Sequence, residues 1–549
     1  MLIIIICMAA FLVNNSALSL DIAEAKTLVT AREMVADGNW DKPTMNGEIR
    51  VHKPPLATWV AAVVEKVYPN NISAQRTVTG VMGIILVFFF FGIARYLERR
   101  RGFAELASMV LLTSYNVIYI ARTVNRGIYA YAFMMGAIYF TVRMLYDARY
   151  YAKPHKWRWA LLAGIMMGLS YLGNGSSAFY SMMLPFIIAM TALRKPDMSG
   201  KWGPVALIFA VCIVTCGWWY LYLWCNNPDA ISMVIDNETA AWKGIHVRPW
   251  YYYWRFFLEM GIWALFTLAA LVVPYWNKRV STKRLYLVTI VWLVIALVLL
   301  SLMPEKSMSD LVPLTMPCAM AVACLLYYYM EKFPKDKWGK GVFFTNGYII
   351  AALIFAMVFF VHFRLANRYI IDFGSALFVN VFLICISYYV AVSTYRKEIV
   401  GIVRGVVALF FFIEFFMIGS IGKLFGNSQR KSIAIMQKNE AFKRLPLYHN
   451  SDEELRIELV YEAGKNIKPL KLDNEADVMK AVPCMVLTHN DISTAIPASL
   501  LQKIDTVRVG TFDDNKHPKR SSHYRKEFIN RLTILDVKNK ASLPADSID

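Results

Sequence analysis

Long apolar runs separated by short polar segments make up most of the first 420 residues of the chain. A run of about 17–25 mostly apolar residues is long enough to cross a bilayer as a helix. The pattern predicts thirteen such helices, near residues 1–16, 77–97, 104–121, 127–146, 158–172, 176–193, 204–224, 255–275, 285–302, 311–330, 343–362, 371–393 and 402–421. The predicted fold class is therefore mainly α, with a polytopic transmembrane helical bundle over residues 1–421.

Two segments between the apolar runs, residues 17–76 and 225–254, are too long to be simple turns. Within the first, residues 21–35 and 56–67 place apolar side chains at helical spacing, which predicts amphipathic helices lying on the membrane surface. The second ends in the aromatic run 250–254, a composition typical of the membrane–water interface. An aromatic run can also form a sugar-stacking platform, so both interpretations of this segment stay open.

The composition changes to that of a soluble domain from about residue 422. Helical patterns at 431–443, 451–463 and 523–531 alternate with β-rich runs at 482–487, 506–511 and 532–537. Ser451, followed by three acidic residues, is expected to cap the second of these helices. A small soluble α/β domain over residues 422–549 is predicted.

Charge gives the orientation of the helices. Only 18% of the residues are charged, against about 25% in an average soluble protein. Lysine and arginine gather in alternate short loops, at residues 95–101, 149–158, 194–201, 278–284, 332–340 and 396–397. The positive-inside rule places these loops in the cytoplasm. The two long segments and the C-terminal domain are then periplasmic, and the chain is expected in a bacterial inner membrane.

The net charge of +20 also raises the question of nucleic acid binding. The basic residues are spread over the short loops, and no compact basic face with interleaved aromatic residues is present, so nucleic acid is excluded as a partner. Membrane lipids are the expected neighbours. The eight cysteines are scattered and form no CxxC pair, which gives no support for a disulfide framework or a metal cluster.

The first long segment carries a series of short motifs. It reads Arg32-Glu33-Met34, then Gly38-Asn39-Trp40, Asn46-Gly47 and His52-Lys53-Pro54-Pro55-Leu56. This order and spacing resembles the first periplasmic loop of the GT-C superfamily, in the group of aminoarabinose transferases and dolichyl-phosphate-mannose-protein mannosyltransferases. Further likeness comes from Arg122 at a helix end, from the stretch 246–253 and from 302–313.

The resemblance implies a membrane glycosyltransferase that moves a sugar from a polyprenyl-phosphate donor to a lipid, glycan or protein acceptor. In such an enzyme basic side chains hold the phosphate and stabilise it as leaving group, and a carboxylate deprotonates the acceptor hydroxyl. The implied phosphate-binding residues are Lys53, Arg122, Arg248 and Lys26. The implied catalytic carboxylate is Glu24, with Asp21 one helical turn before it. Further candidate contacts to donor or acceptor are His52, His246, Lys306 and Asp310.

Several of these residues have a plainer interpretation that stays open. Lys53 fits an interfacial lysine that extends its charge to the headgroups. Asp21 fits the N-cap of the following helix. Arg248 and His246 fit residues that bind lipid headgroups, and Asp310 fits a solvated helix end.

The chain also departs from the family pattern. Ala23 stands where the family has its first acidic residue, and the stretch 124–127 lacks the acidic residue expected after Arg122. His52 replaces a glutamate that helps to bind a divalent metal in some relatives. A histidine can also bind a metal, but no second ligand is identifiable, so no metal site is assigned.

Two other functions compete with the transferase. The departures favour a catalytically silent member that binds a polyprenyl lipid or scaffolds an envelope complex. A secondary transporter is the weaker rival, because the apolar runs contain few charges and no inverted repeat is evident.

Overall fold

The computed structural model describes residues 2–51, 53–146, 155–243, 247–304, 306–366, 370–425, 427, 430–515, 519, 521–522 and 524–538. Its contacts divide the chain into two units. The helical unit contains Met1–Ser16, Val51–Val60 and Asn71–Ile418. The α/β unit contains Ala17–Arg50, Ala61–Asn70 and Gly419–Asp549. The sequence did not predict that most of the first long segment would group with the C-terminal residues.

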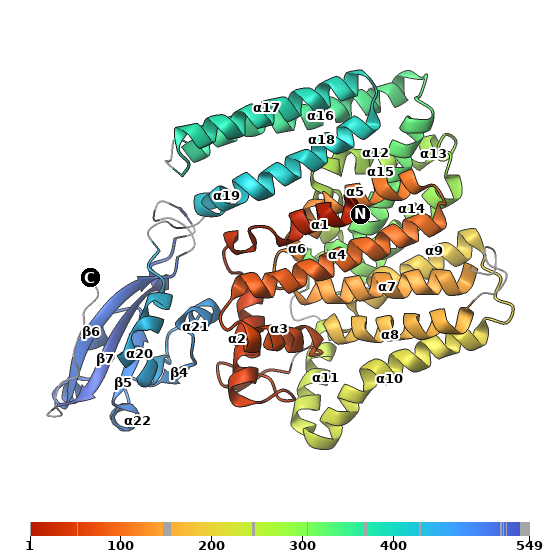
Figure 1. Cartoon of the computed structure of the whole chain (residues 1–549). Coiled ribbons are helices and arrows are strands. Elements are labelled where there is room, and N and C mark those ends of the chain that lie inside the picture. Colours follow the sequence, from red (N-terminus) through yellow and green to blue (C-terminus); the bar gives the residue numbers. More distant parts are fainter. Residues whose placement is uncertain are drawn as a thin grey trace. The chain divides into compact units, whose positions relative to one another are not determined.

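The helical unit is built almost entirely of helices (Figure 1). They are α1 (Leu2–Leu12), the start of α3 (Leu56–Val67), α4 (Ile72–Leu97), α5 (Arg101–Leu112), α6 (Tyr115–Ala121), α7 (Arg126–Tyr146), α8 (Lys156–Asn174), α9 (Leu184–Arg194), α10 (Trp202–Asn226), α11 (Pro228–Lys243), α12 (Ala264–Ala270), α13 (Val273–Trp276), α14 (Lys283–Leu302), α15 (Val312–Glu331), α16 (Lys337–Phe360), α17 (Phe373–Tyr395) and α18 (Ile399–Phe412). Short 3-10 or π segments join several of them.

The prediction of a polytopic helical membrane protein is confirmed, although the helices are less regular than predicted. Among the described residues, 8 helices are long and apolar enough to cross a membrane, or up to 10 if each of two bent pairs forms one span. One such pair, α5 and α6, bends by 68°. The predicted helix at 255–275 is wrong as a continuous span. It consists of the 3-10 segment Phe256–Trp263, which Gly261 interrupts at φ 58°, and the short helices α12 and α13.

Helix α15 forms the centre of this unit. Its predicted span is buried along the whole membrane-crossing window, whereas α10, α16 and α17 leave most of theirs exposed, as expected of lipid-facing helices. Close backbone contact brings α8 against α10, since a Cβ at Gly168 would lie 2.5 Å from Thr215 Cβ. Small residues of this kind are common where membrane helices pack together.

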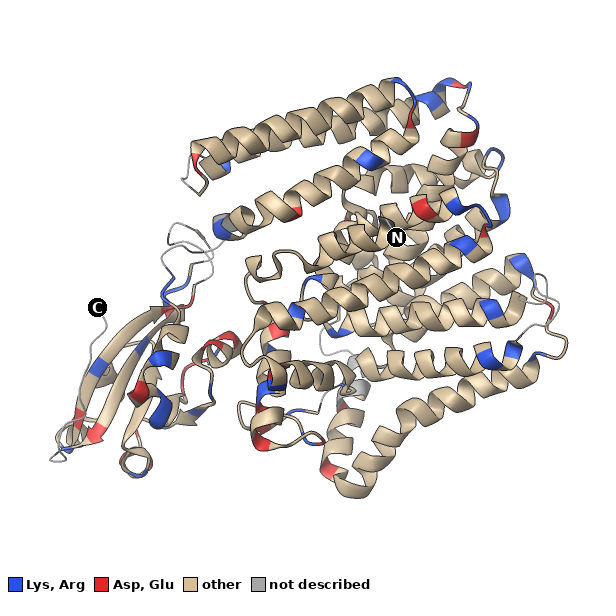
Figure 2. Ribbon diagram, viewed as in Figure 1, with Lys and Arg blue, Asp and Glu red and all other residues tan. Residues whose placement is uncertain are grey.

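Basic residues gather at one end of the long helices of this unit (Figure 2). Arg95 in the last turn of α4, Arg143 in that of α7 and Arg194 in that of α9 belong to this group. The arrangement is the one expected from the positive-inside rule.

The α/β unit contains a five-stranded sheet with the order β4-β3-β5-β7-β6. Strands β3 (Leu447–Asn450), β4 (Ile467–Leu470) and β5 (Cys484–Thr488) are parallel, and β6 (Ile504–Asp513) and β7 (Ile529–Val537) add an antiparallel hairpin. The helices of this part are α19 (Ile418–Phe425), which begins at the unit boundary, α20 (Glu440–Arg444), α21 (Ile457–Ala463), α22 (Glu475–Ala481), α23 (Ile492–Ala495) and α24 (Ala498–Leu501). The prediction of a small C-terminal α/β fold is thus confirmed.

Three details of that prediction are wrong. The helix expected at 431–443 is the 3-10 segment Ile433–Lys438 followed by the short helix α20. The helix expected at 523–531 is a 3-10 turn, Lys526–Phe528, followed directly by β7. Ser451 caps no helix, because α21 starts only after its N-cap residue Arg456. Strands β3 and β4 are four residues each and were not predicted.

The first long segment contributes α2 (Ile22–Asp37) and a small hairpin of β1 (Thr44–Met45) and β2 (Glu48–Ile49) to the α/β unit. The tip is Asn46-Gly47, and both residues have positive φ, 57° and 84°. Asn-Gly is the dipeptide that a tight type I′ hairpin turn favours. Helices are present at both predicted positions, as α2 and α3, and their place on the membrane surface stays a prediction.

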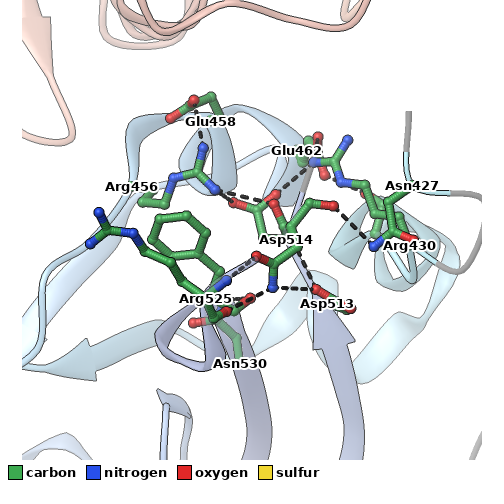
Figure 3. Close-up of polar contacts among 12 residues, drawn as sticks. Asn427, Arg430, Arg456, Glu458, Glu462, Asp513, Asp514, Arg525 and Asn530 are labelled. Atoms are coloured by element: carbon green, nitrogen blue, oxygen red, sulfur yellow. Dashed lines mark hydrogen bonds and ion pairs between the residues drawn. The ribbon is translucent and has the colours of Figure 1, made fainter. Parts of the chain in front are cut away.

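A buried charge network joins the loops of the α/β unit around Asp514 (Figure 3). Its carboxylate pairs with Arg430 Nη2 at 2.6 Å and with Arg456 Nη1 at 2.8 Å. Glu462 and Glu458 accept from the same two guanidinium groups. Asp514 is almost completely buried, so the two arginines are needed to stabilise its negative charge.

We expect Asp514→Ala to weaken the α/β unit by about 3–5 kcal/mol, because it leaves two arginines without their shared carboxylate. Hydrogen exchange of the β6 and β7 amides in the full-length protein measures this local stability. The exposed Asp505 on β6 offers a matched control, and Asp505→Ala should leave exchange unchanged. Equal exchange in the two variants would contradict the assignment.

Candidate active site

Lys53 lies on a short loop that is anchored in the helical unit on both sides. Val51 before it is buried, and Leu56 and Trp59 after it pack on Trp219 of α10 and its neighbours. Trp59 also stacks on the ring of Trp218, with centroids 5.8 Å apart. The side chain of Lys53 itself is exposed. A charged group on a firmly held loop is well suited to bind an anion.

A second basic position is Arg248, in the loop before the 3-10 helix Trp250–Tyr253. Its guanidinium lies over the ring of Tyr252, 4.7 Å from the centroid, and donates to the Tyr252 hydroxyl. The backbone of Arg248 is held by Lys306, whose Nζ donates to the carbonyls of Arg248 at 3.0 Å and Met303 at 2.5 Å. Lys306 is buried, so it positions the Arg248 loop, and its predicted contact with donor or acceptor stays a prediction.

Asp310 completes this group at the entrance to α15. Its Oδ2 accepts from the hydroxyl of Tyr253 at 3.0 Å and from the backbone N–H of Ser307 at 2.8 Å. Burial and the charge of Asp310 raise the pKa of Tyr253, which keeps the phenol protonated as a donor. Asp310 thus completes a capping box with Ser307 at this helix end, and its predicted contact with donor or acceptor stays a prediction.

Arg122 is in a different environment from the one predicted. Its guanidinium donates to the carbonyls of Ala10 at 2.8 Å, Val13 at 2.7 Å and Asn14 at 3.1 Å. It also pairs with Glu414 Oε2 at 2.7 Å, and both side chains are almost fully buried. The structure thus uses Arg122 to join the end of α1 to the last membrane span. Its role as a phosphate ligand stays a prediction and would require the ion pair to open.

The three candidates in α2 lie in the α/β unit. Asp21 is the N-cap of α2, and its Oδ1 accepts from the backbone N–H of Ile22 at 2.7 Å. Glu24 accepts from the N–H of Asp21 at 3.1 Å, which completes a capping box. Glu24 is buried, while Lys26 is half-buried and its carbonyl accepts from Arg50. The N-cap interpretation of Asp21 therefore holds, and the catalytic role of the two carboxylates remains a prediction.

The Arg32-Glu33-Met34 motif has a structural role. Glu33 is buried and accepts from Thr44 Oγ1 at 2.7 Å and from the backbone N–H groups of Asn46 at 2.6 Å and Gly47 at 3.1 Å. Arg32 donates to the carbonyls of Val460 and Tyr461 near the end of α21. The spacing between this motif and Asn46-Gly47 is thus set by a carboxylate that holds a hairpin turn.

The structure brings Arg248, Lys306 and Asp310 into one cluster and Asp21 and Glu24 into another. Lys53 lies on a separate loop of the helical unit, and Arg122 is enclosed. His52 and His246 lie outside the described residues. Within the described residues, no group of three or more His, Cys, Asp or Glu side chains could hold a metal ion.

Comparison with known proteins shows what this chain is similar to. Residues 52–219, which include Lys53 and Arg122, match the family model described as dolichyl-phosphate-mannose-protein mannosyltransferase. The structure of ArnT from Cupriavidus metallidurans bound to undecaprenyl phosphate aligns with 99% of this chain and 98% of its own, with a TM-score of 0.66 at 16% identity. The chain shares the fold of that structure.

Named relatives show a similar likeness in sequence. An undecaprenyl phosphate-alpha-4-amino-4-deoxy-L-arabinose arabinosyl transferase of Pseudomonas savastanoi pv. phaseolicola is 23% identical over 343 residues, 60% of this chain and 61% of the relative. A transferase of the same description from Pseudomonas fluorescens is 25% identical over 335 residues, 57% of this chain and 55% of the relative. The chain spans about three fifths of the length of these relatives. The predicted resemblance to a polyprenyl-phosphate glycosyltransferase is confirmed, and the chain is a multi-pass membrane protein.

Sequence reasoning missed the roles of two carboxylates in this chain. Glu33 was noted only as part of a motif. Glu414 was passed over, although it is an acidic residue within the apolar run 402–421. An ionisable residue inside a membrane span is usually paired with another polar or charged group. This rule alone predicts that Glu414 has a basic partner.

Proposed function

We propose that the chain is a membrane glycosyltransferase that transfers a sugar from a polyprenyl-phosphate donor to a lipid, glycan or protein acceptor at the periplasmic face of the inner membrane. The observation that carries the proposal is the exposed Lys53 on its anchored loop, within the region that matches the mannosyltransferase family. The α/β unit is then periplasmic as well.

In this proposal the chain's own residues supply charge and position. Lys53 binds the donor phosphate and stabilises it as the sugar leaves. Arg248, stacked on Tyr252 and fixed through Lys306, adds a second cation. Glu24, with Asp21, accepts the proton of the acceptor hydroxyl as the oxygen attacks the anomeric carbon.

The test is release of polyprenyl phosphate by protein reconstituted in liposomes with polyprenyl-phosphate sugars and a range of acceptors. The wild type should release it, and Asp21→Asn combined with Glu24→Gln should not. Asp21 also caps α2, so a control must separate loss of its carboxylate from loss of the cap. Asp21→Ser is the matched control, because serine removes the carboxylate but can still cap a helix. Tight lipid binding without turnover in the wild type would contradict the proposal.

A second candidate function is a catalytically silent relative that binds a polyprenyl lipid. Two observations favour it: Asp21 and Glu24 are engaged in a capping box, and Arg122 is enclosed by Glu414. The liposome assay separates the two functions, because the silent protein binds polyprenyl phosphate and releases none.

The pH dependence of transfer tests Lys306. Burial lowers the pKa of Lys306 below its usual value near 10.5. Its protonated form holds the Arg248 loop, so we expect activity to fall as the pH rises through this lowered pKa. Lys306→Arg should move the fall to higher pH, because a guanidinium stays charged. A profile identical in wild type and Lys306→Arg would contradict this role.

A further inference from the structure

The helical unit contains a cavity of about 580 Å³ that the proposed function does not use. It lies between α1, α4 and α5, three helices that pack together (Figure 1). Its size is within the range of about 300–1,000 Å³ that is usual for small-molecule sites. The walls are mainly apolar, with side chains that include Ile4, Cys7, Val87, Phe91 and Met109.

The polar part of the cavity wall is basic. Arg95, in the last turn of α4, and Arg101, the first residue of α5, line it together with Glu105. Arg101 Nε donates to Glu105 Oε1 at 2.8 Å, which leaves the two terminal nitrogens of its exposed guanidinium available. Arg95 is exposed and makes no ion pair or hydrogen bond to any described residue. Two arginines against one glutamate give this end a net positive charge.

The position of these arginines indicates which ligand they would meet. They belong to the end of the helices where basic side chains gather, which the positive-inside rule places at the cytoplasmic leaflet (Figure 2). That leaflet is rich in anionic lipids, and basic pockets between membrane helices on this side bind their headgroups. A cavity with apolar walls and a basic rim is complementary to a lipid with one anionic head and apolar tails.

We propose that the cavity between α1, α4 and α5 binds one anionic diacyl phospholipid from the cytoplasmic leaflet. The phosphate lies between Arg95 and Arg101, and part of an acyl chain lies against Ile4, Phe91 and Met109. The lipid fills the space beside α1, the helix whose other end is held by Arg122. The site is independent of the transferase function.

The experiment compares the lipids retained by purified full-length protein in a neutral detergent. Phosphatidylglycerol and phosphatidylcholine with the same acyl chains are added, and native mass spectrometry measures the affinity for each. We expect one phosphatidylglycerol to bind preferentially. Each basic side chain near an anionic lipid contributes about 1 kcal/mol, so Arg95→Gln with Arg101→Gln should lower the affinity about thirtyfold.

The control removes two positive charges from another position in the helical unit. Lys283→Gln with Arg284→Gln changes two exposed residues at the start of α14 that line no part of the cavity. This variant should bind phosphatidylglycerol like the wild type. A third variant, Met109→Trp, reduces the cavity volume and should lower the affinity while both arginines remain. Equal affinity for the two lipids, equal loss in the two double variants, or preferential binding of polyprenyl phosphate to the cavity would overturn the proposal.

Discussion

Lys53→Ala is expected to reduce the release of polyprenyl phosphate by about a hundredfold or more, without loss of folded protein. Removal of one donor that stabilises developing negative charge commonly costs about 10²–10³ in rate. Lys53 is exposed, and its loop is held by Val51, Leu56 and Trp59, so the substitution leaves that packing intact. Turnover in liposomes, together with thermal stability in detergent, measures both parts of this expectation.

Two further variants make the result specific. Lys53→Arg keeps the charge and should retain part of the activity, though a planar guanidinium does not reproduce a compact ammonium. Lys66→Ala removes another exposed lysine, in the last turn of α3, and should be neutral. If Lys53 only extends its charge to lipid headgroups, Lys53→Ala and Lys66→Ala will behave alike, and its role in phosphate binding is refuted.

The membrane helices could be predicted because their signal is strong and local. A continuous apolar run such as 285–302 has no alternative to a helix in lipid, since every backbone group must be hydrogen-bonded within the segment. The prediction failed at 255–275, where hydropathy is still high. Gly261 has a positive φ of 58° there and interrupts the 3-10 segment Phe256–Trp263, which a hydropathy pattern does not record.

The α/β unit was harder to predict because its elements are short. Strands β3 and β4 are four residues each, and their pairing links segments about twenty residues apart. The predicted helix at 523–531 overlaps β7, whose residues are placed by pairing with β5 and β6. Such tertiary pairing overrides the local propensity of a short segment.

The candidate site could be predicted only in part from the sequence. Motifs identify residue types, but they do not show what each side chain contacts. Glu24 and Asp21 were recognised as acidic residues on one helix, and the structure adds that they cap its first turn. Arg122 was recognised as a basic residue at a helix end, and its partner lies almost 300 positions later in the chain. Long-range pairs of this kind leave no local pattern.

Loss of the ion pair between Arg122 and Glu414 is the second change for which we expect a large effect. Glu414→Gln should destabilise the helical unit by about 3–5 kcal/mol, because it leaves the Arg122 charge buried without its counterion. The three carbonyls of Ala10, Val13 and Asn14 remain as acceptors but carry no formal charge. Reversible unfolding of the detergent-solubilised protein measures the change. The exposed Glu398, at the start of α18, is the matched control, and Glu398→Gln should stay close to the wild type.

A double variant separates the pair from the individual charges. Buried ion pairs can often be replaced by apolar side chains of similar volume with little loss, so Arg122→Met with Glu414→Met should be more stable than Glu414→Gln alone. The coupling between the two positions then follows from the double-mutant cycle. A double variant as unstable as the single one would show that the carbonyl contacts of Arg122 with the end of α1, and not its ion pair, hold the first and last membrane spans together.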